Sequence, residues 1–146
     1  MSPSQLESSK SLCAAFADPS VDPEYLLSHF SSDATAHEHG PQTDTMPFLG
    51  RTIPGISIDG LKIYMPLLQK YVKFSDMSFF DYTSDPGTSR LSVKGKATFT
   101  WTATHKSWDE VFTYVLGFDQ DSKVKTYEVW ADPLSLYAAA KGMKLE

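Results

Sequence analysis

The chain has 146 residues, a length typical of one domain and sufficient to bury an apolar core without disulfide or metal staples. Hydrophobic residues make up 41% and charged residues 21%, which excludes a disordered chain, and a formal charge of −5 with dispersed lysines excludes a basic nucleic-acid-binding surface. Cys13 is the single cysteine, so an internal disulfide cannot form and a zinc site built on clustered cysteines is excluded.

The first residues contain neither a positively charged segment nor an apolar core of the kind that signal peptides carry. No apolar run approaches the ~18 residues that a membrane span needs. We therefore expect a cytoplasmic protein with no membrane or nucleic-acid partner, folded as one domain over residues 1–146.

Two helices are predicted at the N-terminus. The first runs from about Gln5 to Ala17, because apolar residues recur at helical spacing until Pro19. The second is short and begins at Asp22-Pro23, where a capping residue precedes a proline at the first helical position.

A short strand, a long loop and a third helix are predicted next. The segment Ser32–His39 is typical of a turn that enters a strand, and Gly40-Pro41 ends it. The loop extends to about Ser57, and its apolar content predicts that it packs against the core. The third helix starts near Asp59 and contains Pro66, where we expect a kink or a later start.

Beyond residue 77 the apolar period changes from 3.6 to 2, which predicts an antiparallel meander. Its four strands are Met77–Tyr82, Arg90–Thr104, Trp108–Phe118 and Val124–Ala131. On the second strand, apolar residues such as Leu91 and Val93 alternate with polar ones, so one face of the sheet is predicted to be buried and the other wet or paired.

The last predicted element is a helix over Leu134–Lys141, capped by Asp132-Pro133 and ended by Gly142. The predicted order of elements is therefore α-α-β-α-β-β-β-β-α. This order resembles the nuclear transport factor 2-like superfamily over almost the whole chain, and the SnoaL-like polyketide cyclases, isomerases and dehydratases within it. The best local matches are residues 25–34 (YLLSHFSSDA) and 118–124 (FDQDSKV).

The resemblance implies an α+β fold in which a cone-shaped, curved antiparallel sheet packs on the N-terminal helices and opens to a hydrophobic ligand. It implies a cofactor-independent isomerase, cyclase or dehydratase that acts on a hydrophobic, carbonyl-bearing secondary metabolite of the polyketide or terpenoid type by general acid/base catalysis. The alternative is a non-catalytic small-molecule-binding or dimerisation module of the same fold, with a cone filled by its own side chains.

Two further expectations concern partners and cofactors. The face of the second long strand, over Ser92–Thr102, is rich in threonine, and the superfamily commonly pairs through this side of the sheet, so we expect a homodimer. No glycine-rich phosphate-binding motif occurs in the sequence, so we expect no cofactor.

Glu38 is the first candidate catalytic residue. In the ketosteroid isomerase branch the general base lies five residues beyond the Asp of a similar Asp-Ala-Thr stretch, and that position corresponds to Glu38 here. Strand alternation independently places Glu38 on the side of Ala34 and Ala36, which leaves room for a ligand. The alternative is an exposed carboxylate at the end of a strand.

His37 and His39 flank this carboxylate and point to the opposite face unless the strand bulges before Gly40. His39 is a further acid–base candidate, and His37 is a candidate substrate contact. At most the two histidines could share an ion, and no third ligand converges on them, so we predict no metal site.

The same comparison places Tyr114 where that branch keeps a protonated oxyanion donor, and a neutral phenol can donate such a hydrogen bond. Phe112 on the same strand face, Trp101 and Tyr127 are candidate substrate contacts. Glu128 on the last strand is either a second catalytic acid or a solvated residue, because its orientation depends on a register that the sequence does not determine.

The first helix differs from the ketosteroid isomerase branch. Where that branch has a catalytic tyrosine, this chain offers Cys13, Ala14 and Ala15. The difference argues against an isomerisation of the steroid type.

Overall fold

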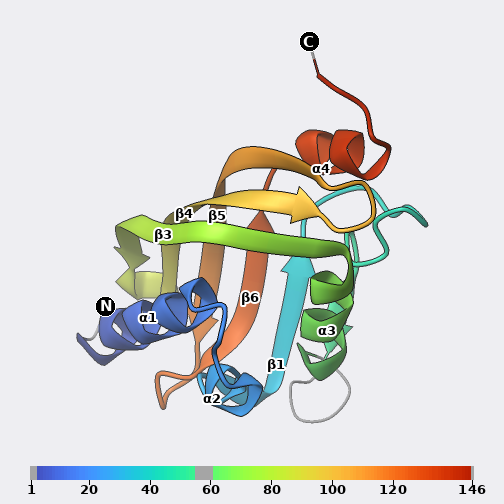
Figure 1. The fold of residues 1–146 in the computed structure, drawn as a ribbon. Helices are drawn as coiled ribbons and strands as arrows, with labels where there is room; N and C mark the ends of the chain where they lie inside the picture. The colour runs from blue at the N-terminus through green and yellow to red at the C-terminus, as the bar shows by residue number, and fades with distance from the viewer. Residues whose placement is uncertain (1–2, 55–60, 146) are drawn as a thin grey trace.

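The computed structural model describes residues 3–54 and 61–145. Within them a six-stranded sheet curls around the helices α1, α2 and α3, and α4 crosses one end of it (Figure 1). The helices are α1 (Pro3–Ala17), α2 (Pro23–Leu27), α3 (Leu61–Tyr71) and α4 (Pro133–Ala140). The strands are β1 (Phe30–Glu38), β2 (Thr52–Pro54), β3 (Val72–Asp85), β4 (Arg90–Trp101), β5 (Lys106–Phe118) and β6 (Val124–Trp130), with a 3-10 turn at Pro86–Thr88.

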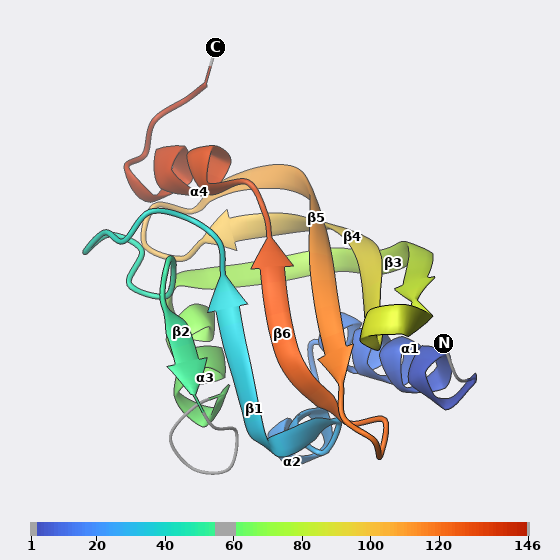
Figure 2. The same ribbon diagram turned by 180° about the vertical axis from the view of Figure 1, so that it is seen from behind.

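The strand order is β2-β1-β6-β5-β4-β3, so the last long strand lies beside the first. This α+β architecture confirms the predicted fold class and the antiparallel meander of β3 to β6. The β1–β6 pair is the exception to the expected antiparallel sheet, because these two strands run parallel (Figure 2). The chain returns to β1 only after the meander, and it arrives there in the same direction as β1.

The connection between β1 and α3 packs as predicted and contains one strand that was not predicted, β2. Met46, Phe48 and Leu49 of this connection are fully buried. The Gly50 N–H donates to the Glu38 carbonyl at 2.9 Å, which folds the connection back onto the end of β1. The predicted end of the loop at Ser57 and the predicted helix start at Asp59 lie outside the described residues.

The strand after the third helix starts earlier than predicted. Helix α3 continues across Pro66 and passes directly into β3, which begins at Val72, five residues before the predicted start. Asp76 and Asp81 have positive φ angles of 54° and 56°, and the register of β3 against β4 shifts near both. Such bulges increase strand twist, so they help β3 to follow the curl of the sheet.

The predicted helix caps and the predicted alternation are both confirmed. The Asp22 side chain accepts a hydrogen bond from the Glu24 N–H, and Asp132 accepts one from the Ser135 N–H at 3.0 Å. Along β4, the odd-numbered side chains from Leu91 to Ala97 are buried, whereas Lys94 and Lys96 are exposed.

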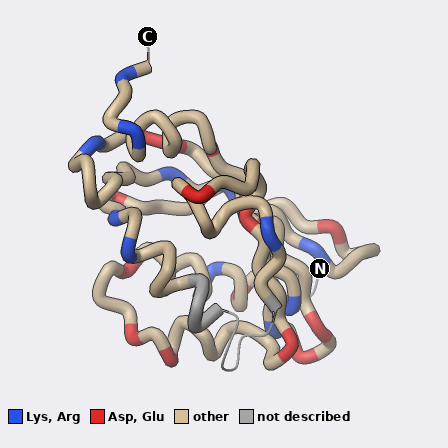
Figure 3. The backbone as a smooth tube through the Cα atoms, turned by 90° about the vertical axis from the view of Figure 1, so that its right-hand side faces the viewer, with Lys and Arg blue, Asp and Glu red and all other residues tan. Residues whose placement is uncertain are grey.

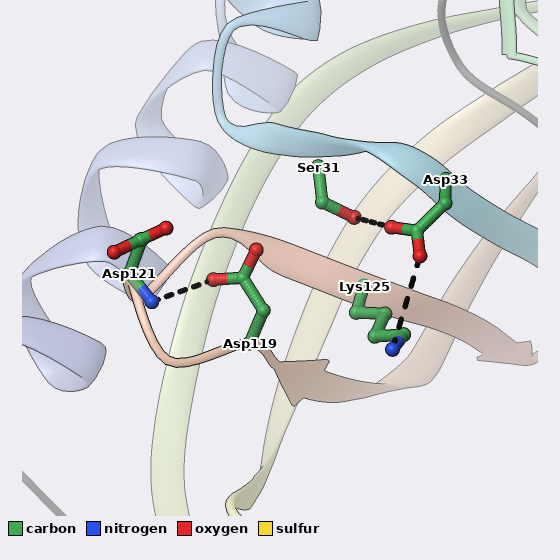
Figure 4. Close-up of polar contacts among 5 residues, drawn as sticks. All are labelled: Ser31, Asp33, Asp119, Asp121 and Lys125. Carbon is green, nitrogen blue, oxygen red and sulfur yellow. Dashed lines mark hydrogen bonds and ion pairs between the residues drawn. The ribbon is translucent and has the colours of Figure 1, made fainter.

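Polar contacts tie the start of β1 to β6 at the outer surface (Figure 4). Asp33 accepts a hydrogen bond from the Ser31 hydroxyl at 2.8 Å and lies 3.8 Å from the Lys125 ammonium group. In the turn between β5 and β6, the Asp119 side chain accepts from the Asp121 N–H at 2.9 Å. Exposed ion pairs of this kind contribute about 0–1 kcal/mol, so they position the strands more than they stabilise them.

Acidic and basic residues are interspersed along the described backbone (Figure 3). Among the described helices, none is long and apolar enough to cross a membrane.

Candidate active site

The curled sheet and the helices enclose a cavity of about 160 Å³. Most of its wall is apolar, and its polar groups are few. The apolar wall includes Phe16, Val21, Phe48, Leu49, Met65, Leu68, Phe99, Phe112, Val129 and Leu136. The acidic and phenolic groups that line it are Asp18, Glu38, Glu110, Tyr114, Tyr127 and Asp132. A mostly apolar cavity with a few converging polar groups is the usual form of a small-molecule site.

Glu38 enters the cavity from the end of β1. The inward face of this strand carries Ala34, Ala36 and Glu38, as alternation predicts, and Glu38 is 9% exposed. One of its carboxylate oxygens, Oε2, is enclosed completely. Phe48 and Leu49 of the packed connection that follows β1 line the same cavity.

Gly50 holds that connection in place. Its φ angle is +72°, and a Cβ atom built on it would lie 2.5 Å from the Gly40 carbonyl oxygen. Only glycine fits this close approach of two backbone segments without strain. The backbone of Glu38, which accepts the Gly50 N–H, is therefore positioned by a contact that tolerates no side chain.

Tyr114 faces the same cavity from β5. Glu38 lies opposite Val129 of β6, and Val129 lies opposite Tyr114, so the three occupy one row across neighbouring strands. Tyr114 is buried and shares a hydrogen bond with the Tyr127 hydroxyl.

The environment of Tyr114 keeps its phenol protonated. Burial raises the pKa of Tyr114 above its ordinary value of 10, and the hydrogen bond from Tyr127 acts in the opposite direction. The neighbouring groups Cys13, Glu38 and Glu110 raise this pKa further. At neutral pH Tyr114 is a neutral phenol that can donate a hydrogen bond, in the same cross-strand row as Glu38.

Aromatic rings surround the two tyrosines. Phe16 of α1 stacks on Tyr127 with ring centroids 5.4 Å apart and contacts Tyr114 at 5.3 Å. Phe112 contacts Tyr114 at 5.2 Å from the next inward position of β5. A Cβ atom on Gly95 of β4 would lie 2.4 Å from the Phe112 ring, so this glycine makes the space that Phe112 occupies.

Glu110 is a cavity residue that sequence analysis places on the face of Tyr114 but to which it assigns no role. It lies on the inward face of β5, and its Oε1 accepts a hydrogen bond from the Trp108 indole N–H at 2.7 Å. The backbone N–H of Asp132 also donates to it. Burial raises the pKa of Glu110 above 4.5, these two donors lower it, and the nearby Asp132 carboxylate raises it.

The signal for Glu110 was present in part. It shares the inward face of β5 with Phe112 and Tyr114, which were both selected, and it lies two residues after a tryptophan. Its second partner, Asp132, is 22 positions farther along the chain, and only the folded structure brings it to β5.

Two of the predicted site residues lie on the opposite face of the sheet. His37 of β1 is opposite Glu128 of β6, and Glu128 is opposite Val115, in a row that points away from the cavity. The His37 ring nitrogen Nδ1 is 3.0 Å from the Thr52 hydroxyl oxygen. The structure therefore does not bring His37 or Glu128 to the side chains of Glu38 and Tyr114.

His39 and Trp101 have other surroundings. His39 is exposed at the edge of the cavity, where its ring stacks on Trp130 with centroids 4.4 Å apart. Trp101 is buried in the core and stacks on Tyr71 at 5.4 Å. Of the predicted substrate contacts, Phe112 and Tyr127 line the cavity.

The two histidines beside Glu38 do not form part of a metal-ligand cluster. Within residues 3–54 and 61–145, no group of three or more His, Cys, Asp or Glu side chains could hold a metal ion.

Comparisons with known proteins identify the fold of the chain. No family model matches the sequence, and no curated protein matches it either. Many solved structures do match, and their descriptions include nuclear transport factor 2-like, ketosteroid isomerase-like and SnoaL-like. The chain therefore has the nuclear transport factor 2-like fold, as the resemblance predicted.

Three of these structures illustrate the likeness. A candidate isomerase from Bacillus subtilis has a TM-score of 0.77 at 13% identity, covering 98% of this chain and 96% of its own. A nuclear transport factor 2-like protein of unknown function from Burkholderia pseudomallei has a TM-score of 0.77 at 17% identity, covering 96% and 98%. TerC, co-crystallized with polyporic acid, has a TM-score of 0.75 at 18% identity, covering 94% and 98%.

Proposed function

We propose that the chain is an enzyme that removes a proton next to a carbonyl group of a hydrophobic small molecule, as an isomerase, cyclase or dehydratase. Glu38 acts as the general base and Tyr114 donates a hydrogen bond to the oxygen on which negative charge develops. The observation that carries this proposal is the placement of a buried carboxyl group and a neutral phenol in one row of an apolar cavity.

Each group supplies a separate part of the chemistry. A carboxylate within reach of a carbon-bound proton contributes about 10²–10⁴-fold to the rate of its removal. A hydrogen-bond donor aimed at the developing oxyanion contributes about 10²–10³-fold in a site that excludes water. Tyr127 supports the donor, because its hydrogen bond to Tyr114 orients the phenol.

The comparisons support the substrate class that we propose. TerC, which has the same fold, was co-crystallized with polyporic acid, and the Bacillus subtilis protein is described as a candidate isomerase. We infer a hydrophobic, carbonyl-bearing secondary metabolite of the polyketide or terpenoid type as the substrate. The side chains named here act without a cofactor in this scheme.

The proposal can be tested without the natural substrate. Ring opening of 5-nitrobenzisoxazole is a removal of a carbon-bound proton that releases a coloured phenolate, and a base in an apolar cavity accelerates it. Replacing Glu38 by Gln keeps the shape of the side chain and removes the base, so the rate should fall by about 10²-fold or more. Glu128→Gln is the matched control, because Glu128 lies on the other face of the sheet.

Three results would count against the proposal. A Glu38→Gln variant that reacts at the wild-type rate would show that Glu38 is not the base. A loss of rate in Glu128→Gln alone would move the base to the outer face. Absence of a rate above that of acetate in the wild type would favour the alternative, a binding module of the same fold.

We further propose that the chain forms a homodimer through the outer face of the sheet. Val111 and Trp130 are 60% and 46% exposed on that face, among partly buried threonines of β4 and β5. Apolar side chains on an exposed sheet face favour association. Sedimentation should therefore give the mass of two chains, and Val111→Lys should shift it toward one. A single-chain mass for the wild type at micromolar concentration would contradict this proposal.

A further inference from the structure

The cavity has a second polar position that the proposed reaction does not use. On β5, Glu110 precedes Tyr114 by four residues on the same inward face, and Phe112 lies between them. Four residues of a strand span about 13 Å between Cα atoms. Glu110 and the Glu38–Tyr114 row therefore lie at different ends of one cavity, separated by an aromatic ring.

The carboxyl group of Glu110 is held in a fixed orientation. The Trp108 indole N–H donates to Oε1 at 2.7 Å, and the Asp132 backbone N–H donates from the start of α4. Trp108 is itself stacked on Phe99 with centroids 5.7 Å apart. Two donors from different elements thus orient a carboxyl group whose side chain faces the cavity.

The surroundings of Glu110 raise its pKa above the ordinary value, although its two N–H donors act in the opposite direction. Burial and the nearby Asp132 carboxylate raise the pKa of Glu110. Both carboxylate oxygens of Asp132 accept hydrogen bonds from Ser135, one from its N–H and one from its hydroxyl. Both oxygens of Asp132 are therefore engaged within the cap of α4.

We infer that Glu110 is a second anchor for the substrate, a carboxylic acid that donates a hydrogen bond to an oxygen atom remote from the reacting carbonyl. The substrate is then an elongated apolar molecule with oxygen atoms at both ends, one beside Glu38 and Tyr114 and one beside Glu110. The inference rests on the proposed function, because it assigns the same cavity to the substrate.

A pair of isosteric probes tests this anchor. 6-Acetyl-2-naphthol and 6-isopropenyl-2-naphthol are flat, apolar molecules that differ at one position. The first has a carbonyl oxygen there, and the second has a CH₂ group. Their dissociation constants can be measured by fluorescence titration near pH 5. The wild type should bind the acetyl compound about three- to tenfold more tightly, which is the range for one hydrogen bond.

Variants of Glu110 separate the anchor from a structural role. Glu110→Gln keeps an N–H donor and should retain most of the preference, whereas Glu110→Leu should abolish it. Glu110→Met serves the same purpose if the leucine variant does not fold, and circular dichroism checks the fold of each. A side chain that only packs against Trp108 and α4 would change the binding of both probes equally.

The outcomes distinguish this inference from the proposed function. Equal affinity for the two probes in the wild type, or an unchanged preference in Glu110→Leu, overturns the anchor even if Glu38 is the base. If neither probe binds, both the anchor and the proposed substrate cavity are overturned. A Glu38→Gln variant with an unchanged rate overturns the proposed function while leaving the probe preference measurable.

Discussion

Glu38 and Glu110 both line the cavity, but their surroundings differ. Glu38 lies at the end of β1 against apolar side chains of the connection that follows, with the Tyr114 phenol in the same row. Glu110 lies in the first half of β5, where Trp108 and the Asp132 backbone donate to it and the Asp132 carboxylate lies nearby.

The difference indicates a division of work. A base must gain and lose a proton in every turnover, so it benefits from neighbours that leave room for the substrate at its oxygens. A binding anchor benefits from fixed donors and a constant protonation state. Glu110 has the fixed donors of an anchor, and Glu38 is the residue that we propose as the base.

The largest effect is expected from a substitution that disturbs the backbone contact at the Glu38 end of the cavity. Gly50→Ala adds a Cβ atom that would lie 2.5 Å from the Gly40 carbonyl oxygen, at a residue with φ of +72°. Strain at such a backbone conformation costs about 1–3 kcal/mol, and overpacking costs about as much. The free energy of unfolding, measured by urea denaturation, should therefore be about 3 kcal/mol lower than that of the wild type.

Gly142→Ala is the matched control for this change. Gly142 also has a positive φ, of +67°, but an added Cβ atom would meet nothing within 4 Å. Its replacement should therefore lower the free energy of unfolding only through backbone strain, by about 1 kcal/mol. Equal losses for the two variants would show that the contact between Gly50 and Gly40 does not hold the end of β1.

A smaller effect is expected from Tyr114→Phe, which removes the donor beside Glu38 and keeps the ring. The rate of 5-nitrobenzisoxazole opening should fall by about 10²-fold, or about 2.7 kcal/mol, because negative charge develops on the departing oxygen. Tyr127→Phe should lower the rate less, since Tyr127 acts through Tyr114. A larger loss in Tyr127→Phe than in Tyr114→Phe would reverse the two roles.

The Glu38 end was predictable because its orientation follows from local periodicity. Ala34, Ala36 and Glu38 alternate along one strand, and the apolar residues of the next connection predicted that it packs. The same rule placed Tyr114 and Phe112 on one face of β5. What alternation could not supply was the face of Glu128, because a shift of one residue in the β6 register reverses it.

The Glu110 end depends on contacts between distant parts of the chain. Asp132 was recognised from sequence as a helix cap, and the structure confirms that role, but the cap also brings its N–H and its charge to β5. The parallel β1–β6 pair was missed for the same reason, since long-range pairing leaves no local pattern. Trp101 was selected as an aromatic contact, yet its stacking on Tyr71 places it in the core.

The smallest expected effect concerns Glu110, and it is a pH dependence of the free energy of unfolding. Because the pKa of Glu110 is raised above 4.5 in the folded chain, the folded state binds more protons than the unfolded state between the ordinary and the raised pKa. The free energy of unfolding of the wild type should therefore fall as the pH rises through that window. Glu110→Gln cannot ionise, so urea denaturation from pH 4 to 8 should show its stability improving relative to the wild type as the pH rises.

Trp108→Phe removes a donor that lowers this pKa, and it should move the window to higher pH. If the stability of Glu110→Gln instead worsens relative to the wild type as the pH rises, Glu110 is held ionised, and its end of the cavity binds a donor rather than an acceptor.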